Sequence, residues 1–481
     1  MKIQQALKII ALLALATLAN AQTWTPLTHQ PGFGATTALL LTDGTVMVQD
    51  SAFTNPNHWW RLKPDSAGSY VNGTWSQLAS LPFGYDPLYY ASAVLADGRV
   101  VIVGGEYNFG SLVESTQAAI YDPQNNTWTS FSGPPAWFQI GDAQSTVLPD
   151  GTFMLGNCCN SSQALLNAST LTWTITGTGK ADSNSEESWT ALPNNVSNPN
   201  NGGVLTVDVH NFLNSEIYNP NTGMWSTAGS TGVQLVTCNE IGPAVLRPDG
   251  SVFATGATSN TAIYNSYFPA WRAGPSFPAG LGVADGPAAL LPNGNVLVNA
   301  SPNSPCYAPG SKFFEFNGTT LTAVANPPRA NVDPAYVGRM LVLPTGQILF
   351  TDGSSDVEVY TSTGTYNFVW QPTLNSYPSN LTVGASWYQI LGTQLNGLSQ
   401  GAMYGDDAQS ATNYPLVRIT NNATGHVFYA FTHNHSSMGV ATGGVQVSTL
   451  FDPPLNMERG LSTLVVVANG IPSAPVTVNV W

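Results

Sequence analysis

One pattern recurs seven times along this chain: an apolar run, a tight turn and a second apolar run. Clear copies are "SAVLADGRVVIVGG" and "PAVLRPDGSVFATG", and a degenerate copy with an insertion begins "WTALPNN". Asp-Gly and Asn-Gly suit hairpin turns because both central residues need positive φ. The turns lie 44 to 55 residues apart, at Asp43, Asp97, Asp150, Asn194, Asp249, Asn293 and Thr345. Each repeat therefore begins with a β-hairpin.

A second signature follows the hairpins, in which a Tyr-Asx-Pro-like turn leads to a Trp. Examples are "AAIYDPQNNTWTSF", with Tyr121 and Trp128, and "SEIYNPNTGMWSTA". Each repeat thus holds four strands, and four-stranded units of this period are typical of propeller blades. The early segment "TWTPLTHQP" resembles a fourth strand but precedes the first hairpin, so we expect it to complete the seventh blade.

The pattern changes after about residue 377. Runs such as "HVFYAFTHN", "GLSTLVVVANG" and "APVTVNVW" alternate at the spacing of sandwich strands. We therefore predict an all-β protein: a seven-bladed, kelch-like β-propeller over residues 22–376, followed by an immunoglobulin-like β-sandwich over residues 377–481.

The first 21 residues have the features of a secretory signal peptide. Lys2 and Lys8 precede the short apolar run "IIALLALATLA", and "ANA" is a small-residue cleavage site. We expect a secreted, periplasmic or cell-surface protein without a membrane span, and a monomer. With 27 acidic and 13 basic residues, the net charge argues against nucleic acid as a partner.

The propeller followed by a sandwich resembles the galactose oxidase and glyoxal oxidase family over nearly the whole mature chain. The segments from "GASWYQILGTQLNGLSQGAMYGDD" to "VVVANGIPSAPVTVNV" resemble that family's last domain. In the family this domain sends a loop with a copper-ligand histidine into the propeller axis. The resemblance implies that "FTHNHSSMG" is this loop and that His433 is the ligand.

The remaining copper ligands of the family are only partly matched. The resemblance implies catalytic roles for Tyr336 and Tyr89, but Val337 stands where the family has a histidine. The cysteine that would be thioether-linked to Tyr89 also has no counterpart. The resemblance therefore implies the fold strongly and a copper-radical oxidase activity weakly.

An independent pattern concerns acidic residues around the channel. Residues eight and nine before each turn should ring one mouth of the propeller, and four blades supply a carboxylate there: Asp142, Glu186, Glu240 and Asp285. Converging carboxylates repel one another unless a cation neutralises them. Together with His433 they would suit Mn²⁺, Zn²⁺ or Ca²⁺ better than copper. The alternative is that each acid caps backbone N–H groups in its own loop.

Four cysteines permit three pairings. Because the fifth and sixth blades are neighbours, a Cys238–Cys306 disulfide is expected, which leaves Cys158 and Cys159 as a vicinal disulfide or as free thiols. Tyr107 and Trp137 lie near the same mouth and could stack on sugar rings.

Two kinds of function remain open. One is a non-catalytic, exported binding module for a glycan or an extracellular protein, with an axial metal site. The other is a metal-dependent enzyme, either a divergent copper-radical alcohol or aldehyde oxidase or a hydrolase that uses the axial carboxylates.

Overall fold

The computed structural model describes residues 22–51, 57–407 and 410–481, so the predicted signal peptide lies outside the described residues. Its regular structure is almost entirely β. The described helical segments are two short 3₁₀ turns, η1 (Ala335–Val337) and η2 (Phe368–Trp370). No helix in the described ranges has the length and apolar character needed to cross a membrane.

Seven sheets in the described residues each contain four antiparallel strands that are neighbours in the sheet. In the first four these strands are β2 (Ala35–Leu40), β3 (Val46–Asp50), β4 (Trp59–Lys63), β5 (Thr74–Gln77); β7 (Ala91–Val94), β8 (Val100–Val103), β11 (Gln117–Asp122), β12 (Thr127–Ser132); β13 (Ser145–Val147), β14 (Phe153–Gly156), β15 (Gln163–Asn167), β16 (Thr172–Thr176); β17 (Thr190–Ala191), β18 (Val204–Val207), β19 (Ser215–Asn219) and β20 (Met224–Thr227).

The last three consist of β21 (Ile241–Leu246), β22 (Ser251–Gly256), β23 (Thr261–Asn265), β24 (Ala270–Ala273); β26 (Ala288–Leu290), β27 (Val296–Pro302), β28 (Lys312–Phe316), β29 (Leu321–Ala323); and β30 (Arg339–Val342), β31 (Ile348–Thr351), β32 (Glu358–Thr361) with β1 (Thr23–Pro26). Short additional strands lie in the loops: β6 (Pro87–Leu88), β9 (Tyr107–Asn108), β10 (Ser111–Leu112) and β25 (Leu281–Gly282).

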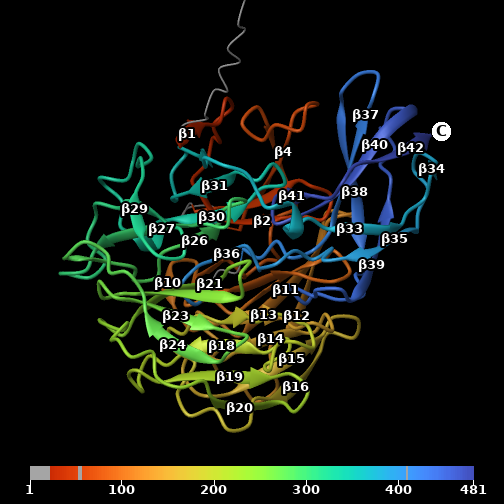
Figure 1. Ribbon diagram of the computed structural model, residues 1–481. Helices are drawn as coiled ribbons and strands as arrows, with labels where there is room; N and C mark the ends of the chain where they lie inside the picture. Colours follow the sequence, from red (N-terminus) through yellow and green to blue (C-terminus); the bar gives the residue numbers. More distant parts are fainter. Residues whose placement is uncertain (1–21, 52–56, 408–409) are drawn as a thin grey trace, which may run out of the picture.

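The first strands of neighbouring sheets pack against one another around an axis. β2 contacts β30 and β7, β7 contacts β13, and β26 contacts both β21 and β30. The N-terminal β1 pairs with β32 of the last sheet, and Trp24 packs its ring against Phe313 and Phe350. This is the predicted all-β propeller, in which the N-terminal strand completes the last sheet (Figure 1).

Each sequence signature has a physical role. In the Asp-Gly turns the Asp carboxylate accepts a hydrogen bond from the N–H two residues later, as between Asp43 and Thr45 at 3.0 Å. Gly44 has φ of 75° but Asp43 does not have a positive φ, so the expectation that both turn residues are left-handed is wrong and only the glycine is. The Tyr and Trp of one copy are cross-strand neighbours, as in the Tyr121–Trp128 pair with ring centroids 5.1 Å apart. The Trp128 indole N–H also donates to Ala79 O at 3.0 Å, and thereby links one sheet to the preceding one.

The C-terminal strands form a separate sheet system beside the propeller (Figure 1). It begins at β33, which pairs with β35, so its first strand precedes residue 377. β38 pairs with β37 through its first half and with β39 through its second half, and it thereby connects two layers. The strands are β33 (Thr373–Ser376), β34 (Asn380–Leu381), β35 (Tyr388–Thr393), β37 (Leu416–Asn421), β38 (Val427–His433), β39 (Gln446–Asp452), β40 (Gly460–Ala468), β41 (Ile471–Pro472) and β42 (Val476–Val480).

One loop of this C-terminal part leaves it and runs along the propeller axis. We name residues 398–407 and 410–414 the axial loop. Its short strand β36 (Ala402–Met403) pairs with β26, and the Gln400 side chain bonds to Ala191 N at 2.8 Å and to Thr146 Oγ1 at 3.1 Å. Figure 1 shows β36 among the propeller strands, apart from β37 to β42. The axial loop thus fills the space between the inner strands.

Candidate functional site

The four predicted acids converge at one mouth of the channel. Two groups of carboxylates form there: Asp142, Glu186 and Asp406, and Glu186, Glu240 and Asp285. Within each group, one oxygen from each residue lies within 4.8 Å of the others. The four predicted acids, Asp142, Glu186, Glu240 and Asp285, lie just before β13, β17, β21 and β26, respectively. Asp406 comes from the axial loop. We call these five residues the axial carboxylates.

Several of these carboxylates have buried oxygens without a hydrogen-bond partner. They are Glu240 Oε2, Asp285 Oδ1 and Asp406 Oδ2, and the Glu240 and Asp406 residues are only 7% and 2% exposed. A buried carboxylate without a partner is costly, so it is either protonated or paired with a cation. The prediction that each acid caps its own loop does not account for these three oxygens.

The electrostatics of the site favour uptake of a proton or a cation. Burial raises the pKa of Glu186 to about 7, although a hydrogen bond with Asp406 lowers it. Burial, and then the Asp285 and Glu186 carboxyls, raise the pKa of Glu240 to about 12. The pKa values of Asp142, Asp285 and Asp406 also lie well above their usual range because of burial and of the neighbouring acids. Mutual repulsion in a partly dry pocket explains the common direction.

The backbone at this mouth adopts left-handed conformations. Glu186 and Asp285 have φ of 58° and 55°, and Tyr89 has φ of 51°. In the third blade the corresponding turn uses Gly141, with φ of 69°, and the acid follows as Asp142. Non-glycine residues in this region cost free energy and cluster at functional sites, so the retained side chains at Glu186 and Asp285 support a functional role for this mouth.

The tyrosines that the resemblance implied also lie here, but around an arginine. The Arg339 guanidinium lies 3.6 Å from the ring centroid of Tyr404 and 5.8 Å from that of Tyr89. It donates to the Tyr336 carbonyl at 2.6 Å, as does the Tyr404 hydroxyl. Arg339 is 5% exposed and supplies a fixed positive charge next to the acids.

These residues do not fit a copper-radical centre. Among the described residues, the metal-ligand groups at this mouth contain only carboxylates and no imidazole. Tyr89 has no cysteine neighbour to form a thioether, since all four cysteines form disulfides. Copper favours imidazole and sulfur ligands, whereas an all-oxygen set favours Ca²⁺, Mn²⁺ or Mg²⁺.

The predicted position of His433 is wrong. His433 ends β38 in the C-terminal sheet, with Nε2 at 3.4 Å from Asp452 Oδ1 and its ring edge-to-face with Trp387. The neighbouring Thr432 N–H donates to Thr42 O, next to the turn at Asp43. His435, also buried, donates its backbone N–H to Ala96 O. The histidine pair therefore helps to hold the C-terminal sheets against the turn end of the propeller, opposite the axial carboxylates.

The axial loop occupies the place that we had predicted for the histidine segment. The sequence analysis missed Tyr404, Asp406 and Asp407, which this loop delivers to the mouth. A side chain at Gly405 would lie 2.2 Å from Asp285 Oδ1, so only glycine permits this close approach. One signal was present in the sequence: "GLSQGAMYGDDAQSATN" is a long stretch without strand alternation, and long loops of this kind are often functional.

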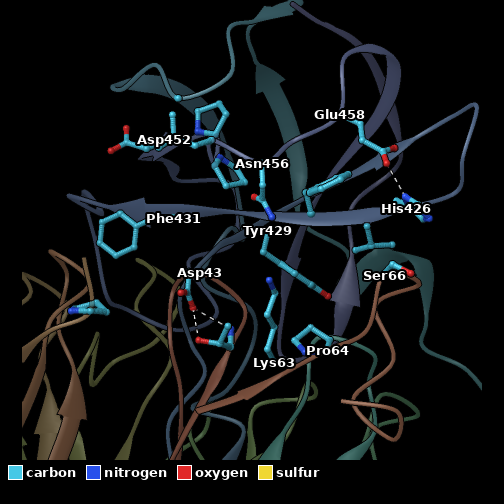
Figure 2. Close-up of a pocket in the computed structure, with 18 of the residues that line it drawn as sticks. Asp43, Lys63, Pro64, Ser66, His426, Tyr429, Phe431, Asp452, Asn456 and Glu458 are labelled. Carbon is cyan, nitrogen blue, oxygen red and sulfur yellow. Dashed lines mark hydrogen bonds and ion pairs between the residues drawn. The ribbon is translucent and has the colours of Figure 1, made fainter. Parts of the chain in front are cut away.

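A cavity of about 890 Å³ lies at the opposite, turn end, between the first blade and the C-terminal sheets (Figure 2). Lys63, Tyr429 and Asp452 are among the residues that line it. Its acids have partners: Glu458 pairs with His426 at 2.6 Å, and Asp43 accepts from Thr45. Because the axial carboxylates include oxygens without partners, we place the candidate site at the axial mouth and not in this cavity.

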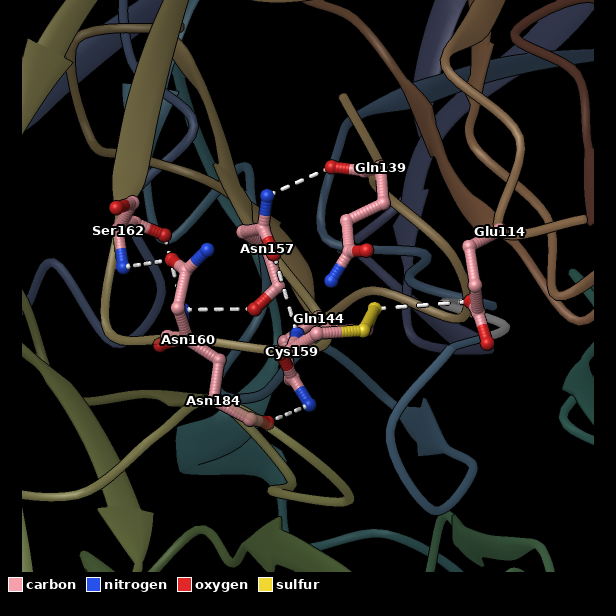
Figure 3. Close-up of a disulfide and its surroundings, with 9 residues drawn as sticks. Glu114, Gln139, Gln144, Asn157, Cys159, Asn160, Ser162 and Asn184 are labelled. Atoms are coloured by element: carbon pink, nitrogen blue, oxygen red, sulfur yellow. Dashed lines mark hydrogen bonds between the residues drawn. A yellow bond between two sulfur atoms is a disulfide. The ribbon is translucent and has the colours of Figure 1, made fainter. Parts of the chain in front are cut away.

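Both disulfides lie near the axial mouth. The predicted Cys238–Cys306 bridge is confirmed, and it positions Tyr307, whose hydroxyl donates to Glu240 Oε1. Cys158 and Cys159 form a vicinal disulfide. Figure 3 shows Glu114 facing it, with Oε2 at 3.6 Å from Cys158 Sγ. The bridges fix the rim beside the acids.

The predicted sugar-stacking residues lie on or near this rim. Tyr107 is half-buried in β9, with its ring centroid 6.2 Å from that of Tyr89. Trp137 is half-buried and packs against the propeller core, while its neighbour Phe138 is 94% exposed. Sugar binding by these rings stays a prediction.

A second buried acidic group lies in the fourth blade and consists of Asp182, Glu187 and Asp208. Here Lys180 Nζ lies 2.8 Å from Glu187 and 2.6 Å from Glu216, with all three side chains at most 2% exposed. Burial lowers the pKa of Lys180, but the two carboxylates outweigh it and hold this pKa above its usual value. These three acids together with Lys180 and Glu216, which we call the Lys180 cluster, contain a resident cation, although Asp208 Oδ1 is buried without a hydrogen-bond partner.

Comparison with known proteins agrees with the propeller fold. No family model matches the chain. A kelch-like protein, terF of Aspergillus terreus, is 28% identical over 92 residues, which is 18% of each chain. A fungal alcohol oxidase of the AA5 family, solved in complex with copper, matches 96% of this chain and all of its own, with a TM-score of 0.55 and 14% identity. A streptogramin B lyase covers 71% of this chain, with a TM-score of 0.50 and 10% identity. These likenesses support a propeller of the kelch and galactose oxidase-like type; at such identities they show the fold alone.

Proposed function

We propose that this chain is an exported binding protein that holds a divalent cation on its axial carboxylates and uses it to bind a glycan. One observation carries the proposal: five carboxyl groups from four blades and the axial loop meet at one mouth and include buried oxygens without partners. A divalent cation with oxygen ligands removes the repulsion among them. Ca²⁺ and Mn²⁺ suit this donor set, and both accept further oxygen ligands.

The rim supports a glycan as the ligand. Sugar hydroxyls are oxygen donors for Ca²⁺ or Mn²⁺, and aromatic faces pack on the apolar faces of sugar rings. Tyr307, which is 40% exposed and bonds to Glu240, supplies such a ring beside the acids, and the half-buried Tyr107 lies near Tyr89. Phe138 is exposed and lies four residues before Asp142 in the sequence. The two disulfides stabilise the loops that carry these residues, as is typical of exported proteins.

The experiment compares glycan binding with and without a cation. Purified protein is depleted of metal with a chelator and screened against a glycan panel in the presence of Ca²⁺, Mn²⁺ or chelator. We expect binding only with a cation, and loss of binding in Asp285→Asn. The matched control is Asp150→Asn, which changes an exposed carboxylate at the turn end of the third blade, where it accepts from the Thr152 N–H, and should keep binding. Glycan binding that persists in chelator would contradict the proposal.

A hydrolase is the second candidate, and one feature favours it. Glu186 has a pKa near 7 and a left-handed backbone in the same site, as general acids and bases often have. Turnover of glycosides or esters that disappears in Glu186→Gln would favour this enzyme over the binding protein. We do not propose a copper-radical oxidase, because the carboxylate donor set does not fit that centre.

A further inference from the structure

We infer that the axial site holds two divalent cations bridged by Glu186. This inference rests on the proposed cation binding and adds the number of ions and the role of each carboxylate. Its starting point is that the two carboxylate groups share one member, Glu186: the first group adds Asp142 and Asp406, and the second adds Glu240 and Asp285.

The spacing within each group fits one ion. Oxygens bound to a single Ca²⁺ at about 2.3–2.6 Å can be no more than about 5 Å apart. The oxygens of each group lie within 4.8 Å of one another, so three carboxylates can contact one cation without a change of backbone. Water and an external ligand would complete each coordination sphere.

Each group also has its own unpartnered buried oxygen. In the first group it is Asp406 Oδ2; in the second group they are Glu240 Oε2 and Asp285 Oδ1. Glu240 and Asp285 interact through a side-chain hydrogen bond, which requires a shared proton. Asp406 Oδ2 in the first group is a separate buried acceptor, so an ion in the second group does not satisfy the first.

The order of the blades explains why Glu186 is the bridge. Asp142, Glu186, Glu240 and Asp285 come from the third, fourth, fifth and sixth blades in succession. The axial loop adds Asp406 next to Glu186, with which it forms a hydrogen bond. Glu186 is thus the member that both groups share, and its backbone has the left-handed conformation.

The charge of the site exceeds that of one divalent cation. Glu106, Asp407 and Glu114 interact electrostatically with Glu186 and add three carboxyl groups to the five axial ones, while Arg339 supplies one positive charge. If all are ionised, seven negative charges remain. One divalent cation leaves five of them and two leave three, which protons or a ligand can balance. Two-metal sites with a carboxylate bridge hold their ions about 3.5–4 Å apart.

The test uses Mn²⁺ with the full chain, because Mn²⁺ can be counted and gives an electron paramagnetic resonance spectrum. We expect two Mn²⁺ per chain by calorimetry and by metal analysis after gel filtration, with an exchange-coupled spectrum. One Mn²⁺ per chain, or two without coupling, would overturn the bridged pair and leave the proposed cation binding intact. No bound Mn²⁺ or Ca²⁺ would overturn both.

Variants assign each ion to its group. Asp142→Asn with Asp406→Asn should leave one uncoupled Mn²⁺, and so should Glu240→Gln with Asp285→Asn. Glu186→Gln should abolish the coupling and weaken both ions at least tenfold. Asp150→Asn, at the opposite, turn end of the third blade, should keep two coupled ions. If Glu186→Gln keeps the coupled spectrum, Glu186 is not the bridge. Circular dichroism of each variant separates loss of metal from loss of fold.

Discussion

Two buried acidic clusters in this protein differ in one respect, the presence of a resident cation. In the Lys180 cluster the ammonium lies within 2.8 Å of two carboxylates that are almost fully buried. At the axial mouth five carboxylates gather, and the nearest fixed cation, Arg339, stacks on Tyr404 and donates to backbone carbonyls. The first cluster leaves one buried oxygen, Asp208 Oδ1, without a hydrogen-bond partner, whereas the axial carboxylates leave three. The comparison teaches that a buried ammonium reduces, but does not remove, the number of buried acidic oxygens without a partner.

The largest expected effect comes from removing the resident cation. Lys180→Met should destabilise the protein by about 3–5 kcal/mol, because it leaves Glu187 and Glu216 buried and uncompensated. Chemical denaturation measures the change. Arg99→Ala is the control, since the Arg99–Asp97 pair is roughly 30% exposed on both sides and should contribute less than about 1 kcal/mol. Similar losses in the two variants would show that the Lys180 cluster is no more dependent on its cation than a surface pair.

The next prediction tests whether the axial carboxylates bind a cation from solution. Each cation at 100 times its Kd should stabilise the native chain by about 2.7 kcal/mol, and Glu240→Gln should lose the gain from the group of Glu186, Glu240 and Asp285 while it keeps the gain from the other group. The metal-free variant should be no less stable than the metal-free parent, because the amide oxygen of the new side chain can still accept from the Tyr307 hydroxyl. Glu187→Gln, in the Lys180 cluster, should do the reverse: it should lower stability and keep the cation response. Thermal unfolding with and without Ca²⁺ or Mn²⁺ distinguishes these outcomes.

The propeller and the acidic mouth could both be predicted from sequence for the same reason. A repeat places equivalent residues at equivalent positions, so one Asp-Gly turn locates the others, and counting back from the turns located Asp142, Glu186, Glu240 and Asp285. The disulfide Cys238–Cys306 followed from the neighbouring blades. Within the repeats, the number of residues between a position and its turn is enough to predict which residues meet at the axial mouth.

The part outside the repeat could not be predicted in this way. Residues 398–407 and His433 both lie in loops or strand ends of the C-terminal part, and no periodicity relates them to the axis. The pairing of Ala402 with Ala289 and the collision that excludes any side chain at Gly405 exist only in three dimensions. The resemblance therefore suggested a histidine where the structure brings Asp406.

A smaller effect concerns pH. The pKa of Glu186 is raised in the folded protein to about 7, so the native state binds more protons than the unfolded state between about pH 4.5 and 7. Stability of the metal-free protein should therefore fall as pH rises through this range, by about 1–2 kcal/mol after allowance for the partly exposed side chain. Glu186→Gln should reduce this slope by the share of one group, because Asp142, Asp285 and Asp406 also have raised pKa values, and a saturating cation should reduce it further in the parent. A metal-free profile that rises over this interval would contradict the raised pKa.

The smallest expected effect is that of His433 on cation binding. His433 contacts Trp387 and Asp452 in the C-terminal sheets, at the turn end of the propeller, so His433→Ala should leave the cation-induced rise in Tm unchanged even if the baseline Tm falls. His29→Ala is the matched control, because its Nδ1 bonds to the Gly73 carbonyl at 3.0 Å and it belongs to neither axial group. Equal cation responses in the parent and in both variants are expected from differential scanning fluorimetry. If His433→Ala alone removes the response, imidazole belongs to the metal site. The axial loop would then not be the sole C-terminal contributor to it, and the contrast between the two acidic clusters would no longer rest on carboxylates alone.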